Sequence, residues 1–122
     1  MPLPNTWNWQ IPVGAESGAN FQIQNPDGTP YPISGATWEY VVRAAGTSAG
    51  TPVISVTTTA NTEGALTVTT SPVSNVALTL YPAATATLSP GSYSHALWMN
   101  PGATTAMLWV TGTLTVTAVA QP

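Results

Sequence analysis

The chain has 122 residues and a mass of 12.5 kDa, enough for one domain that closes a single hydrophobic core without cross-links. Charged residues make up 4 % of the chain, against about 25 % in an ordinary soluble domain, and the net charge is −3. Such a surface repels copies of itself weakly and loses little hydration energy on contact. The composition suits a subunit packed against neighbours, and it equally suits a neutral soluble monomer with a hydroxyl-rich surface.

The residue types that the chain lacks exclude several classes of protein. Arg43 is the single basic side chain, whereas nucleic-acid binding needs several Lys or Arg residues to displace counterions from phosphates. The absence of cysteine excludes a disulfide framework and a thiolate metal site. The N-terminus has no signal-peptide pattern, and no apolar run approaches the roughly 18 residues of a membrane helix. We expect a separate gene product, made inside the cell, without a membrane partner.

Alternation of apolar and polar residues predicts three strands in the first part of the chain, over residues 7–13, 19–24 and 36–43. Asn25-Pro26-Asp27-Gly28 ends the second strand, because Pro presets φ and Gly accepts a positive φ. The third strand is expected to bury one face, formed by Ala36, Trp38, Tyr40 and Val42.

The second part of the chain has the same character, with strands predicted over residues 53–58, 65–70, 75–80, 92–99 and 105–118. Residues 82–88 favour one helical turn that connects two sheets. Short strands parted by Gly and Pro turns predict an all-β, antiparallel, Ig-like β-sandwich of about seven to eight strands. We expect a single domain over residues 1–122, in which residues 1–15 form an N-terminal arm or an edge strand.

The side chains that could carry chemistry are few and scattered. The four acidic residues are isolated in sequence: Glu16, Asp27, Glu39 and Glu63. Nothing places two of them at the roughly 5–9.5 Å separation of a paired-carboxylate hydrolase. The sole histidine, His95, lies in a predicted strand without a nucleophile motif, so we expect a half-buried, hydrogen-bonded strand residue. We predict no catalytic, cofactor or metal site, and a protein that is not an enzyme.

A contact surface is the better prediction for the last hairpin. The last strand is expected to bury four positions: Leu108, Val110, Leu114 and Val116. Met107 and Trp109 would then point outward, with Trp98 near them across the hairpin. Exposed aromatic residues on an uncharged surface are typical of protein interfaces, and they also stack on sugar rings. A tryptophan covered by its own loops is the third interpretation.

Arg43 is the remaining candidate interface residue, because it is the only cation of the chain. It shares the outward face of its strand with Glu39. Residues four apart in a strand are separated by roughly 13 Å, so these two side chains are not expected to pair directly. A contact of Arg43 with Glu63 or with another subunit remains open.

The order of turns and strands resembles a family of small phage β-sandwich proteins, similar to the N-terminal domain of baseplate upper proteins and to tail-connector and head-accessory domains. The resemblance begins with the glycine loop and strand at residues 18–23, the turn at residues 25–30 and the strand entry at residues 33–38. It continues over residues 64–68, 88–93 and 112–116. The chain departs from the family by lacking the charged residues usual around its first and third strands.

The resemblance implies a structural protein of the virion, synthesised in the host cytoplasm, with no catalytic residues to carry over. We expect a capsid decoration or accessory subunit that docks on a larger assembly, with a tail or baseplate accessory protein as the alternative. The expected partners are the major capsid or tail protein of the same particle and further copies of this chain. A carbohydrate-binding or adhesion module that uses exposed tryptophans is the alternative from another class.

Overall fold

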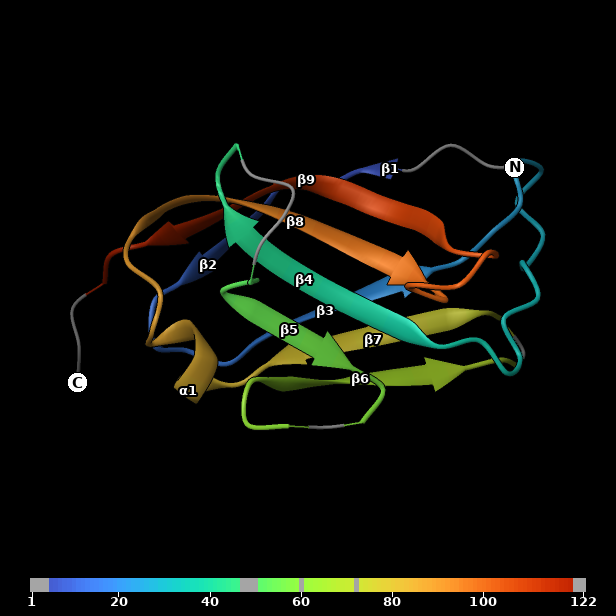
Figure 1. The fold of residues 1–122 in the computed structure, drawn as a ribbon, viewed down its shortest axis with the longest axis horizontal. Helices are drawn as coiled ribbons and strands as arrows, with labels where there is room; N and C mark the ends of the chain where they lie inside the picture. The colour runs from blue at the N-terminus through green and yellow to red at the C-terminus, as the bar shows by residue number, and fades with distance from the viewer. Residues whose placement is uncertain (1–4, 47–50, 60, 72, 120–122) are drawn as a thin grey trace.

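The computed structural model describes residues 5–46, 51–59, 61–71 and 73–119, which form two β-sheets packed face to face (Figure 1). The larger sheet contains β1 (Asn5–Thr6), β2 (Trp9–Pro12), β4 (Trp38–Ala44), β5 (Ile54–Thr57), β8 (Gly91–Met99) and β9 (Met107–Thr117). The smaller sheet contains β3 (Ser17–Gln22), β6 (Gly64–Thr69) and β7 (Asn75–Leu80). The predicted all-β sandwich is therefore confirmed, with nine strands among the described residues because the predicted N-terminal strand is divided in two.

The chain passes several times from one sheet to the other, so strands that are neighbours in a sheet are not always neighbours in sequence. The larger sheet has the order β1-β9-β8-β4-β5, with β2 also paired to β9, and the smaller sheet has the order β3-β7-β6. All pairs are antiparallel except β1 and β2, which both run parallel to β9. The sandwich is thus not wholly antiparallel as predicted, and the N-terminal segment forms an edge of the larger sheet.

The N-terminal edge is divided because regular pairing with β9 is interrupted at residues 7–8, with the same register on both sides of the gap. The Trp7 amide donates to the carbonyl of Thr111 at 2.9 Å, and regular pairing resumes at Trp9, opposite Leu114. At the gap, the Trp7 carbonyl lies so close to Gly112 that a Cβ on this residue would collide with it. Gly112 therefore permits the N-terminal segment to approach β9.

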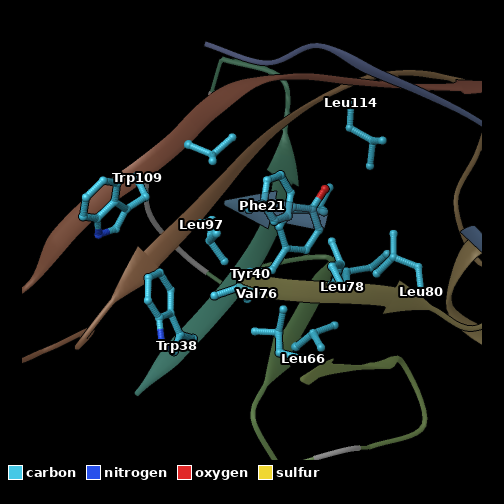
Figure 2. Packing of buried hydrophobic residues seen from close by; sticks show 14 of the residues in the cluster. Phe21, Trp38, Tyr40, Leu66, Val76, Leu78, Leu80, Leu97, Trp109 and Leu114 are labelled. Carbon is cyan, nitrogen blue, oxygen red and sulfur yellow. The ribbon is translucent and has the colours of Figure 1, made fainter. Parts of the chain in front are cut away.

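The core lies between the two sheets and is filled by alternate residues of both (Figure 2). Trp38, Tyr40 and Val42 of β4 are buried, as the alternation predicts, whereas Ala36 is half-buried. From the smaller sheet, β7 contributes Val76, Leu78 and Leu80 in strict alternation with half-buried residues. Alternation thus identified the buried face of β4.

One short helix, α1 (Pro82–Thr85), carries the chain from β7 in the smaller sheet to β8 in the larger, as expected for residues 82–88. Its buried Thr85 hydroxyl donates to the carbonyl of Ala15 at 2.9 Å, which fixes the helix against the turn between β2 and β3. The part of the chain that the structure describes contains no helix long and apolar enough to cross a membrane.

The orientation predicted for Trp109 and Met107 is wrong, because β9 contains a bulge. In the pairing of β8 with β9, Leu97 faces Val110 and Trp98 faces Leu108, so Trp109 has no partner across the ladder. An extra residue reverses the alternation on one side of a bulge. Trp109 is consequently 4 % exposed and Met107 packs against the core, whereas Leu108, predicted to be buried, lies on the outer face.

Candidate contact surface

The outer face of the larger sheet brings together residues from β4, β8 and β9. The register places them in rows across the first two strands, with Glu39 beside Trp98, Val41 beside Ala96, and Arg43 beside Ser94. On β9, Leu108 continues the row of Trp98. This face points away from the core, because its residues alternate with the buried residues of the same strands.

An open groove of about 420 Å³ runs over this face. Its apolar lining includes Val41, Ala96, Trp98 and Leu108, all but Val41 only half-buried, together with Pro101 and Ala106 from the loop between β8 and β9. Val41 is 7 % exposed although it is not part of the cluster between the sheets. The groove therefore offers a half-covered apolar floor, which is the kind of surface that a protein or a flat ring can bury.

Charges of opposite sign line this groove on either side of Val41. Glu39 and Arg43 both line it, two residues to either side of Val41. The Ser55 hydroxyl on β5 donates to Oε2 of Glu39 at 2.7 Å, which fixes the position of this carboxylate. The other acidic residues lie outside these three strands, in the turn before β3, the loop after it and the loop before β6.

The four candidate interface residues are thus divided between the two faces of the sheet. Trp98 and Arg43 line the groove, whereas Trp109 and Met107 face the core and cannot contribute to the same surface. Sequence reasoning missed Leu108, which takes the outward place that was assigned to Trp109. The sequence placed Glu39 and Arg43 on one outward face of their strand but predicted no groove there.

His95 lies beneath the groove and is 2 % exposed, so it is fully buried rather than half-buried as expected. Its Nε2 lies 2.6 Å from the carbonyl oxygen of Trp7 and must donate, because a carbonyl only accepts. Nδ1 therefore accepts from the hydroxyl of Tyr40 at 2.9 Å. Burial lowers the pKa of His95, and the hydrogen bond to Trp7 opposes this effect. Both ring nitrogens are engaged, so the neutral imidazole links three segments of the fold.

No group of three or more His, Cys, Asp or Glu side chains lies close enough to hold a metal ion within residues 5–46, 51–59, 61–71 and 73–119. The outer face of the larger sheet combines the aromatic Trp98 with several aliphatic side chains and two opposite charges.

No protein-family model and no curated protein matches the sequence. The second Ig domain of mouse polymeric immunoglobulin receptor is similar in structure, with a TM-score of 0.50 at 8 % identity over 97 % of this chain and 100 % of that one. A structure from photo-crosslinking analyses of multimeric cell-adhesive interactions of VGSC beta subunits has a TM-score of 0.50 at 10 % identity, over 99 % and 98 % of the two chains. At such low identity the likeness concerns the fold alone. Together with the strand order, it identifies the chain as an Ig-like β-sandwich.

Proposed function

We propose that the chain is a structural, non-catalytic subunit of a bacteriophage particle, which docks in many copies on a larger shell and stabilises it. The observation that carries the proposal is the apolar groove around Trp98 on a chain with 4 % charged residues. The resemblance of the turns and strands to small phage β-sandwich proteins supports the assignment to a phage particle. Capsid decoration is the form of this role that we propose.

The mechanism is the addition of many modest contacts. Sparse charge makes each contact cheap to desolvate, and few like charges oppose the crowding of copies on one surface. On a symmetric shell, identical contacts repeat at every equivalent position. A particle held at many points resists expansion and rupture better than the strength of one contact implies.

Deletion of the gene tests the proposal. Particles assembled without this chain are expected to lose resistance to heat and to low salt, and addition of the purified protein is expected to restore it. Particles with unchanged resistance would contradict decoration. The copy number per particle, measured by quantitative mass spectrometry, distinguishes a head location with hundreds of copies from a neck or baseplate location with tens or fewer.

Glycan binding remains the second candidate, because Trp98 lines an open groove that a sugar ring could enter. The burial of Trp109 removes the second stacking platform that the sequence suggested. A glycan array with the wild-type chain and with Trp98→Ala distinguishes the candidates. Sugar binding that Trp98→Ala abolishes would favour adhesion, whereas loss of particle association without any sugar signal would favour decoration.

A further inference from the structure

We infer that the outer face of the larger sheet pairs with the same face of a second copy of this chain. The two copies would be related by a twofold axis that crosses the strands at Val41 and Ala96. The inference rests on the proposed function only in treating this face as a protein contact. Beyond the proposed function, the inference specifies the partner, the symmetry of the pair and the register of its strands.

The first argument is the arrangement of the rows on β4 and β8. Val41 and Ala96 form the central row, with Glu39 and Trp98 on one side and Arg43 and Ser94 on the other. A twofold axis along the central row reverses the strand direction and exchanges the two outer rows. Each outer row of one copy then faces the opposite outer row of the second copy.

Charge complementarity follows from this exchange. Glu39 of each copy would face Arg43 of the other, so the only cation of the chain is used twice across one interface. An axis parallel to the strands would instead place Glu39 on Glu39 and Arg43 on Arg43 if it ran over β4, or each charge on an uncharged side chain of β8 if it ran between β4 and β8. Neither of these arrangements pairs opposite charges, and like charges in contact weaken a complex, so the charges favour the antiparallel arrangement.

The sizes of the side chains select the same arrangement. The row of Glu39 carries the large Trp98 with Leu108 beside it, whereas the row of Arg43 carries the small Ser94. The exchange lays each Trp98 over Ser94 of the second copy, and the small Ala96 lies on the axis. Two sheets that pack face to face need such interdigitation to reach a separation of about 10 Å. The groove of about 420 Å³ supplies the space for the opposing tryptophan.

A charge exchange tests the register. We expect sedimentation equilibrium to show a dimer for the wild-type chain and a dissociation constant at least about tenfold higher for Arg43→Glu and for Glu39→Arg. The double variant with both exchanges should regain at least about tenfold of this loss, because it restores the two opposite pairs. Glu63→Arg is the matched control for Glu39→Arg. It makes the same change in net charge, but on the loop before β6, outside the proposed interface.

Circular dichroism must show that each variant is folded, and the recovery in the double variant separates a lost contact from a damaged fold. A wild-type chain that stays monomeric up to about 1 mM would overturn the inference. A double variant that dimerises no better than the single variants would also overturn it.

Cross-linking provides a test that does not change any charge. The native chain contains no cysteine, so a single introduced thiol reports on its own position. Ala96→Cys places a thiol beside the axis, and a short bis-maleimide is expected to produce a covalent dimer. Thr67→Cys, exposed on the smaller sheet, is the matched control and should remain monomeric. Equal yields from the two variants, or no dimer from Ala96→Cys, would contradict the pairing.

The two proposals can fail separately. If the wild-type chain is monomeric but particles without it lose heat resistance, the pairing is wrong and decoration stands. If the chain pairs in the predicted register but no purified particle contains it, decoration is wrong and the pairing stands.

Discussion

His95 donates a hydrogen bond from Nε2 to the carbonyl oxygen of Trp7, and this 2.6 Å contact joins β8 to the N-terminal edge across 88 residues of sequence. The two rings also stack, with centroids 5.6 Å apart. The contact requires the Nε2–H tautomer when the ring is neutral, and Nδ1 is then free to accept from Tyr40. One buried histidine therefore couples the N-terminal segment to the core.

The stability of the fold is expected to decrease in mild acid. Burial lowers the pKa of His95 below its ordinary value of 6.5, so protons bind the unfolded chain more readily than the folded one. The stabilisation is complete above pH 6.5 and is lost as the pH falls from there towards the folded-state pKa. Urea unfolding between about pH 8 and pH 5 measures this dependence. His95→Gln is the control, and an equally steep decrease in that variant would contradict the assignment to His95.

Tyr40→Phe is expected to lower the free energy of unfolding by about 1–3 kcal/mol, because Nδ1 of His95 would remain buried without a donor. Tyr93→Phe is the matched control: the hydroxyl of Tyr93 donates to the carbonyl of Ser89 at an exposed site, where water replaces it. Urea unfolding of both variants gives the comparison. Equal losses of unfolding free energy would show that the buried hydrogen bond to His95 contributes no more than the exposed one.

Gly112→Ala is expected to destabilise the fold by about 2 kcal/mol or more, because the new methyl group would collide with the carbonyl of Trp7. Gly18→Ala is the control, since its Cβ would meet only the carbonyl of Leu78 at an ordinary 3.4 Å. Hydrogen exchange should show that Gly112→Ala loses protection first in residues 5–12. Unchanged protection there would contradict the role given to this glycine.

Trp109→Ala is expected to cost about 3–5 kcal/mol of unfolding free energy, as for other large residues removed from a core. Trp98→Ala should cost less than half as much, because Trp98 is half-buried on the outer face. Denaturation at low protein concentration keeps any pairing of copies from contributing. The reverse order of the two losses would contradict the bulge in β9.

The sequence contained much of the local structure. The strand predicted over residues 75–80 is β7 itself, and the predicted buried positions of β4 hold at Trp38, Tyr40 and Val42. Pro82 begins the expected helical turn. These features depend on neighbours two to four positions away, where alternation and the fixed φ of proline act directly.

The contact surface depended on features that are not local. Trp98 and Arg43 were correctly placed on an outer face, but Trp109 was not, because the bulge appears only when β9 is aligned with β8. A single extra residue reverses which side chains reach the surface, and nothing in the order Met107-Leu108-Trp109-Val110 reveals it.

The sequence by itself therefore determined that this chain is an all-β sandwich with few charges, since periodicity and composition are properties of single segments. Only the tertiary structure decided that the N-terminal segment runs parallel to β9, that Trp109 belongs to the core, and that Glu39, Trp98 and Arg43 share one groove. The physical reason is that strand register results from packing between segments far apart in the chain, and register determines the face on which each side chain lies.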